Sequence, residues 1–274
     1  MTLLQALVLG ILQGLTEFLP VSSTAHLVLV PWALGWEIPR EARFAFTVLV
    51  QDGTLLAVVV YFRCDLWAVL RAVLDGLRRR APLGTPEARL GWWIVLGTVP
   101  GVACALAFRG FLQGLHDRPA VPAAVLLGAT AILFLGERLG KRSRGMDSMT
   151  AGDALFVGTW QVLALFPGVS RSGATITGGL LRDLDRPAAA RFSFLLSIPV
   201  LLGAGAHQTI ELAGREGALA EVPPLAVGFV AAAVVGYASI PWLLGFLARH
   251  PLTAFAWYRI AAGLGFLALA LYRG

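Results

Sequence analysis

The sequence has 274 residues, of which 57% are hydrophobic and only 14% are charged, and its mean hydropathy is +0.75. Soluble domains of this size carry about 25% charged and 45–50% apolar residues. The composition therefore excludes a disordered chain, a secreted disulfide scaffold and an ordinary cytosolic enzyme, and it predicts a polytopic membrane protein. The net charge of +6 is typical of nucleic-acid binding in soluble proteins. In a chain this apolar it indicates loops that face a cytoplasmic leaflet, so we expect the lipid bilayer and no nucleic acid as partner.

Six stretches, taken in chain order, are long and apolar enough to cross about 30 Å of hydrocarbon, which requires roughly 20 helical residues. They lie near Phe44–Phe62, Leu90–Phe108, Ala120–Gly136, Phe192–Ile210, Pro224–Phe246 and Leu252–Tyr272. The sequence therefore predicts an all-α integral membrane protein with six transmembrane helices.

Two further regions, residues 3–36 and 151–181, have a different pattern. Each contains an apolar arm that ends at a proline (Pro20 and Pro167), a polar tip, and a second apolar arm too short to span the membrane. Both are predicted to be re-entrant helical hairpins. Polar tips at membrane depth are tolerated only where protein or a water-filled cavity surrounds them.

The sequence also matches itself at an offset of 148 positions. The pairs include Gly10/Gly158, Gln13/Gln161, Phe18/Phe166, Ser22/Ser170, Pro39/Pro187 and Arg43/Arg191. We therefore expect a single membrane domain over residues 1–274, with repeat one near residues 1–136 and repeat two near residues 151–274. Each half holds one hairpin and three spans, and because three is odd the second half must be inverted. The tips, Ser22–His26 and Ser170–Gly173, should then meet near the midplane, where inverted-repeat proteins bind substrate.

Hydroxyl side chains gather at both tips, where each second arm begins. The N-terminus of a helix favours an anion, because its first backbone N–H groups have no partner within the helix. Arg171 adds a permanent cation, and its planar guanidinium suits phosphate because it can donate two parallel hydrogen bonds. Two helix N-termini and Arg171 together predict a phosphate site. The other residues expected to bind the substrate there are Ser22, Thr24, Ser170, Ser172, Gly173 and Thr175.

A hydroxyl, an imidazole and a carboxylate lie beside the predicted phosphate site. Ser23 or Ser22 could attack phosphorus, with His26 as general acid or base. Glu17 and Gln13 are one helical turn apart and offer oxygen ligands for a divalent metal, Mg²⁺ or Ca²⁺. A carboxylate at membrane depth is costly when unpaired, which favours a functional interpretation.

Other polar residues leave alternatives open. Arg259 could line the cavity or pair with a carboxylate such as Glu17. Gln51 and Asp52 are polar enough to face the cavity, although Asp52 could instead form an ion pair within the membrane. The run Arg78–Arg80 is expected to anchor an interfacial helix in the cytoplasm.

The segments Gln13–His26 and Pro167–Thr175 resemble the two signature motifs of the bacterial undecaprenyl-diphosphate phosphatases of the bacitracin-resistance type, and Phe192–Pro199 resembles the next helix of that family. The resemblance implies hydrolysis of undecaprenyl diphosphate to undecaprenyl phosphate and inorganic phosphate, which recycles the lipid carrier for peptidoglycan synthesis. It further implies dependence on a divalent metal, bacitracin resistance, and a multi-pass protein of the bacterial inner membrane whose active site opens to the periplasmic side. A homodimer is left open.

The same resemblance assigns roles to individual residues. Ser23 matches the family's nucleophile, His26 its acid or base, and Arg171 its phosphate-binding arginine, while Glu17 and Gln13 match its acidic motif. Gln13 stands where a glutamate is more familiar, which makes Glu17 the dominant metal ligand. The rival hypothesis is a lipid-phosphate transporter or flippase built on the same inverted repeat. Such a protein would need Arg171 and the helix ends, but it would have no use for Ser23 beside His26.

Overall fold

The computed structural model describes residues 1–108, 120–213 and 222–273, and every element named within them is a helix. In chain order these are α1 (Leu3–Thr16), α2 (Ser23–Ala33), α3 (Arg40–Tyr61), α4 (Arg63–Arg78), α5 (Pro86–Ala107), α7 (Ala120–Gly128), α8 (Thr130–Leu139), η2 (Met146–Ser148), α9 (Ala151–Val162), η3 (Leu163–Leu165), α10 (Arg171–Leu181), α11 (Arg186–Ala213), α12 (Val222–Leu247) and α13 (Thr253–Arg273). The prediction of an all-α protein is thus confirmed for this part of the chain.

All six predicted spans are present in the described residues as segments long and apolar enough to cross a membrane. They are Ala42–Tyr61, Pro86–Ala107, Val121–Leu139, Arg186–Ala206, Val222–Leu247 and Thr253–Arg273. The fourth begins six residues earlier than predicted, because the carboxylate of Asp185 accepts a hydrogen bond from the backbone N–H of Ala188 and so caps α11. The third is interrupted at Ala129, where α7 ends and α8 begins.

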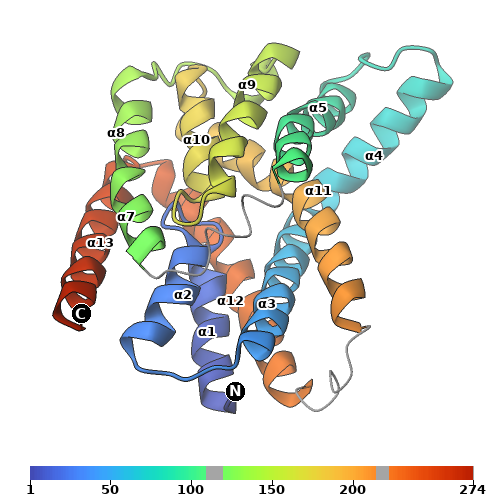
Figure 1. Ribbon diagram of the computed structural model, residues 1–274. Helices are drawn as coiled ribbons and strands as arrows, with labels where there is room; N and C mark the ends of the chain where they lie inside the picture. Colours follow the sequence, from blue (N-terminus) through green and yellow to red (C-terminus); the bar gives the residue numbers. More distant parts are fainter. Residues whose placement is uncertain (109–119, 214–221, 274) are drawn as a thin grey trace.

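The two regions with short arms form two helix pairs, α1 with α2 and α9 with α10 (Figure 1). The connecting segments, which we call loop 1 (residues 17–22) and loop 2 (residues 166–170), lie side by side at the centre of the molecule. Loop 1 also contacts the first turn of α10: the Ser172 hydroxyl donates to the Leu19 carbonyl oxygen at 2.9 Å, and Arg171 pairs with Glu17. Residues of the second predicted tip therefore lie against loop 1.

The remaining helices surround these loops. Helices α1 and α3 both pack against α12, α5 packs against α9, and α10 packs against α11 (Figure 1). The contact between α5 and α9 is backbone to backbone, because a Cβ atom on Gly158 would lie within 3.0 Å of the carbonyl oxygen of Gly97.

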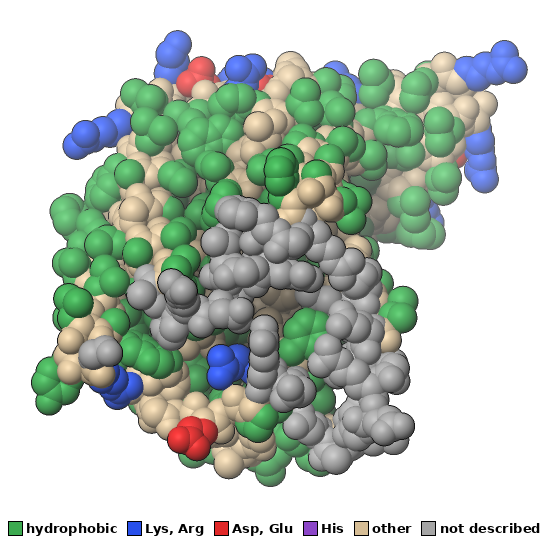
Figure 2. All heavy atoms as spheres, viewed as in Figure 1, with side chains coloured by type: hydrophobic (Ala, Val, Ile, Leu, Met, Phe, Trp, Pro, Cys, Tyr) green, Lys and Arg blue, Asp and Glu red, His purple; other side chains and the backbone are tan. Residues whose placement is uncertain are grey.

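Helix α4 extends away from the bundle, and none of its side chains is fully buried. Figure 2 shows hydrophobic side chains over much of one face and basic side chains along its upper edge, as expected for a surface that contacts lipid.

Two buried carboxylates tie the helices together on the side that carries the α8–α9 and α10–α11 connections. Glu137 accepts hydrogen bonds from Arg142 and Arg186 and from the backbone N–H of Leu252, and it thereby joins α8, α11 and the start of α13.

Asp153, whose side chain is fully buried, is held in the same region by Arg144 and Arg182, each at 2.7 Å. Burial alone would raise the pKa of Asp153, but the hydrogen bonds from these two arginines and from Thr150 outweigh it and hold the pKa well below its usual range.

Candidate active site

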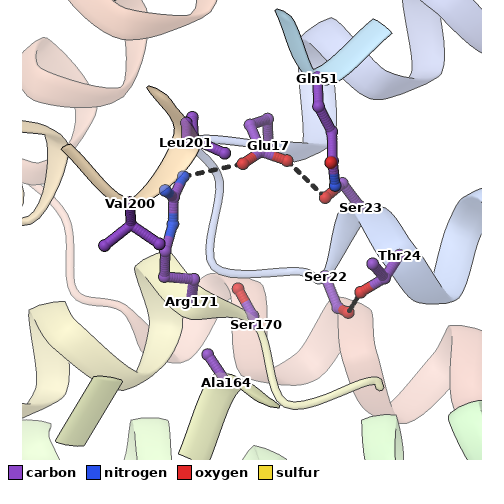
Figure 3. Close-up of a pocket in the computed structure, with 10 residues that line it drawn as sticks. All are labelled: Glu17, Ser22, Ser23, Thr24, Gln51, Ala164, Ser170, Arg171, Val200 and Leu201. Atoms are coloured by element: carbon purple, nitrogen blue, oxygen red, sulfur yellow. Dashed lines mark hydrogen bonds and ion pairs between the residues drawn. The ribbon is translucent and has the colours of Figure 1, made fainter. Parts of the chain in front are cut away.

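Loop 1 and loop 2 enclose a pocket of about 140 Å³, shown in Figure 3. Its walls come from both helix pairs, from the middle of α3 and from the middle of α11. The lining residues are Glu17, Ser22, Ser23, Thr24, Gln51, Ala164, Ser170, Arg171, Val200 and Leu201.

The two serines that begin the second arms have the same local geometry. Ser22 and Ser170 have φ values of 71° and 76°, which non-glycine residues rarely adopt, and both occupy N-cap positions. Their hydroxyl oxygens accept hydrogen bonds from the backbone N–H groups of Ala25 and Gly173. Strained backbone of this kind persists only where the surroundings determine it, and it is concentrated at functional sites. Each cap places the N-terminus of a helix, α2 or α10, at the pocket, which suits an anion.

Glu17 is the central polar group of the pocket (Figure 3). Its Oε1 accepts a hydrogen bond from Arg171 Nη2 at 2.8 Å. Its Oε2 accepts one from the hydroxyl of Ser23 at 2.6 Å and one from Gln13 Nε2 at 2.9 Å. One carboxylate therefore joins the first residue of α2 to the first residue of α10. Its link to Ser23 is a short hydroxyl–carboxylate bond, the geometry that proton transfer requires.

Gln13 lies behind Glu17 and does not line the pocket. Its side chain is fully buried, and its Oε1 atom has no hydrogen-bond partner among the described residues. An unpaired buried acceptor is costly, so this oxygen is a feature that the packing of the described residues does not account for. Within the described residues no cluster of three or more His, Cys, Asp or Glu side chains could hold a metal ion. Of the two predicted metal ligands, Glu17 lines the pocket and Gln13 lies behind it.

The structure does not bring His26 to the pocket wall. The ring is only 2% exposed; Nδ1 lies 2.7 Å from the carbonyl oxygen of Ser22, and Nε2 lies 2.8 Å from the hydroxyl of Tyr258. The rings of His26 and Tyr258 are stacked, with centroids 5.7 Å apart. Both ring nitrogens are therefore engaged away from Ser23, whose own hydroxyl bonds to Glu17.

Three other predicted site residues support the loops from behind and do not line the pocket. Ser172 bonds to loop 1, the backbone N–H of Gly173 donates to Ser170, and Thr175 lies 2.6 Å from the hydroxyl of Ser193 on α11. Their contacts are with protein groups, and they hold α10 in place.

Several lining residues were absent from the predicted site. Gln51 was noted only as polar enough to face a cavity, and its side chain does point toward Ser23 (Figure 3). Ala164, Val200 and Leu201 are apolar, so no feature of the sequence separates them from other membrane residues. Among the described residues, Arg259 neither lines the pocket nor pairs with a carboxylate, so neither alternative raised above is supported there. Its hydrogen bonds go to backbone carbonyl oxygens.

Comparison with known proteins agrees with this geometry. Residues 6–265 match the family described as Bacitracin resistance protein BacA. Among curated proteins, an undecaprenyl-diphosphatase of Chlorobium chlorochromatii is 47% identical, covering 98% of this chain and 97% of that protein. Proteins of the same name from Anaeromyxobacter dehalogenans and Chlorobaculum tepidum are 46% and 42% identical, with at least 92% of each covered. The six candidate spans and this match indicate a multi-pass membrane protein, and the chain belongs to the bacitracin resistance protein BacA family.

Proposed function

We propose that this chain is a membrane hydrolase that converts undecaprenyl diphosphate to undecaprenyl phosphate and inorganic phosphate, and so recycles the lipid carrier for peptidoglycan synthesis. The observation that carries the proposal is the hydrogen-bonded series Ser23–Glu17–Arg171 inside one pocket (Figure 3). In it, hydrogen bonds link a hydroxyl that can act as nucleophile, a carboxylate that can accept its proton and a cation that can bind phosphate. The substrate is supported by relatives 42–47% identical that are named undecaprenyl-diphosphatase. Bacitracin resistance is supported by the name of the family.

Binding of the diphosphate is assigned to Arg171 together with helix N-termini and hydroxyls from both helix pairs. Arg171 begins α10 at the pocket, and its Nη1 also reaches the carbonyl oxygen of Ser197 at 3.4 Å, which orients the guanidinium. The N-termini of α2 and α10 add the positive ends of two helix dipoles. The hydroxyls of Ser22, Thr24 and Ser170 line the same space and can donate to phosphate oxygens. The apolar Val200 and Leu201 fit the first carbons of the prenyl chain.

The chemical step follows from the bond between Ser23 and Glu17. The Ser23 oxygen bonds to the terminal phosphorus while the bond from that phosphorus to the bridging oxygen breaks, and undecaprenyl phosphate leaves. The Ser23 proton passes to Glu17, which already accepts its hydrogen bond. Water then cleaves the phosphoserine, which restores the hydroxyl and releases inorganic phosphate. The involvement of His26 as acid or base stays a prediction, since its bond to Tyr258 would have to open first.

A transporter would need the cation and the helix ends but not a hydroxyl bonded to a carboxylate. The Ser23–Glu17 contact therefore favours hydrolysis over transport.

A divalent metal, Mg²⁺ or Ca²⁺, is compatible with the donor set. Glu17 would supply a carboxylate at the pocket, and Gln13, one helical turn before it, would supply the buried amide oxygen that has no hydrogen-bond partner among the described residues. Mg²⁺ is usually bound by one or two carboxylates, several waters and the phosphates of the substrate, so a larger acidic cluster is not required. When bound, the ion would neutralise charge on the diphosphate.

The placement in the membrane forms part of the same proposal. Helices α1 and α9 are shorter than any of the six candidate spans, which supports re-entrant hairpins at residues 3–36 and 151–181. The shared geometry of Ser22 and Ser170, 148 positions apart, supports an inverted repeat within one domain. Basic residues such as Arg144 and Arg182 would mark the cytoplasmic end of a protein of the bacterial inner membrane, with the pocket open to the periplasmic side.

The test is phosphate release by the purified protein in detergent from undecaprenyl or farnesyl diphosphate, with and without EDTA. We expect release that EDTA suppresses and that Arg171→Ala reduces at least 100-fold, because the guanidinium is the cation at the pocket. Arg191→Ala is the matched control, because Arg191 pairs with Asp65 on α4, outside the pocket. No release by well-folded protein in any of several divalent ions would refute hydrolysis. EDTA-insensitive release would refute only the metal.

A further inference from the structure

Arg259 lies on α13, behind the two loops. Among the described arginines it is the one with no exposed surface. Its Nη1 donates to the carbonyl oxygens of Val169 at 3.0 Å and Pro20 at 3.5 Å, and its Nη2 donates to Gly168 at 3.0 Å. Its Nη2 and Nε also donate to the carbonyl oxygen of Leu126 on α7, at 3.0 and 3.2 Å. A single guanidinium thus contacts loop 1, loop 2 and α7.

The positions of these carbonyl groups matter for the pocket. Val169 directly precedes Ser170, and Pro20 lies two residues before Ser22, so Arg259 holds the backbone next to both strained caps. Its Nη1 is also 3.5 Å from the place where a Cβ atom on Gly173 would lie, directly beneath the first turn of α10.

A buried arginine in a membrane protein is expensive unless its donors are satisfied. Arg259 satisfies them with backbone oxygens, which carry no countercharge, whereas Arg171 in the same region pairs with Glu17. The planar guanidinium has donors in a fixed fork, so it can join three segments at defined angles. The burial of Arg259 and its contacts with both loops therefore indicate that this residue fixes the distance between them.

We propose that Arg259 is a positioning residue: it locks loop 1 to loop 2 and thereby keeps the Ser23 hydroxyl in line with the phosphate bound by Arg171. This inference rests on the proposed function. Misplacing a reacting group by about 1 Å can reduce turnover roughly 100-fold. Substrate affinity depends on Arg171 and the helix N-termini, which Arg259 does not replace.

The informative variant is Arg259→Lys, because it keeps the charge and most of the length. A lysine ammonium places all its donors on one atom and cannot reach loop 1, loop 2 and α7 together. We expect kcat to fall at least 10-fold with KM within about 3-fold of the parent. The control is Arg273→Lys on the same helix, because Arg273 also donates to backbone carbonyls, those of Trp32 and Ala33 at 2.8 and 2.9 Å, far from the loops. Its kinetics should match those of the parent.

Hydrogen–deuterium exchange supplies a readout that does not require activity. Arg259→Lys should speed amide exchange in residues 17–25 and 166–174, whereas Arg273→Lys should not. Unchanged exchange there, unchanged kcat, or a rise in KM with kcat intact would each overturn the positioning role. If the parent protein itself releases no phosphate while the exchange difference appears, the proposed function fails and the tie between the loops stands.

Discussion

Glu17→Gln is the substitution that tests the proposed chemistry most directly. Glutamine has nearly the shape of glutamate, but it cannot take a proton from Ser23, and its amide nitrogen must face either Arg171 or the donors Ser23 and Gln13. Loss of a general base typically slows a reaction 10²–10⁴-fold, which corresponds to about 3–5 kcal/mol of transition-state stabilisation. We therefore expect kcat for undecaprenyl diphosphate to fall at least 100-fold.

Glu137→Gln provides the matched comparison. Glu137 is another buried carboxylate held by arginines, Arg142 and Arg186, but it lies outside the pocket. Its substitution should lower the free energy of unfolding by about 1–3 kcal/mol and leave kcat unchanged. The assay is steady-state phosphate release together with thermal unfolding in the same detergent. If Glu17→Gln kept kcat within 3-fold of the parent, or if both variants lost activity only in proportion to stability, Glu17 would not be the proton acceptor.

Three further predictions concern the nucleophile, helix packing and pH. Ser23→Ala should reduce kcat at least 1,000-fold with little change in unfolding temperature, and near-normal turnover would exclude Ser23 as the attacking group. Gly158→Ala should destabilise the protein by about 1–3 kcal/mol, because the added methyl group meets the backbone of Gly97. Gly152→Ala on the same helix has room for the added methyl group and should not destabilise the protein. Equal unfolding temperatures for the two variants would contradict the packing argument. Because the folded pKa of Asp153 is depressed, its contribution to stability is complete above the usual carboxyl pKa, about 4, and is lost as pH falls below it. Asp153→Asn should reduce the loss of stability that the parent protein shows at acid pH. An unchanged stability–pH profile would contradict the view that the arginine contacts of Asp153 cause that loss.

The sequence located the spans and the two tips because both depend on local composition. An apolar run of about 20 residues must cross the bilayer, whatever its neighbours are. The break at Ala129 was missed although Gly128 ends α7, because a single glycine inside an apolar run of spanning length does not by itself predict a break. The pairing of Glu17 with Arg171 was not predicted, because Arg171 was assigned to phosphate and Arg259 was considered as the partner of Glu17.

The orientation of His26 and the role of Arg259 could not be predicted for a different reason. The partner of His26 is Tyr258, 232 residues away, and no spacing in the sequence connects them. Arg259 contacts only backbone carbonyls in the bonds that orient it, and every residue type offers those. The types of the side chains therefore predict a carboxylate partner for a buried arginine, but they cannot predict a site formed by backbone carbonyl groups.

The offset of 148 positions explains why the pocket needs both halves. Ser22 and Ser170 occupy equivalent positions and keep the same strained cap, so the backbone device is duplicated. The residue after the cap differs between the halves, because Ser23 in the first half corresponds to Arg171 in the second. Glu17 likewise corresponds to the apolar Leu165. One copy of the hairpin therefore supplies the hydroxyl and its proton acceptor, and the other supplies the cation. Since the carboxylate of Glu17 bonds to both first residues, the charge of Glu17 in one half is balanced by Arg171 in the other, and neither hairpin alone would form a site for a diphosphate.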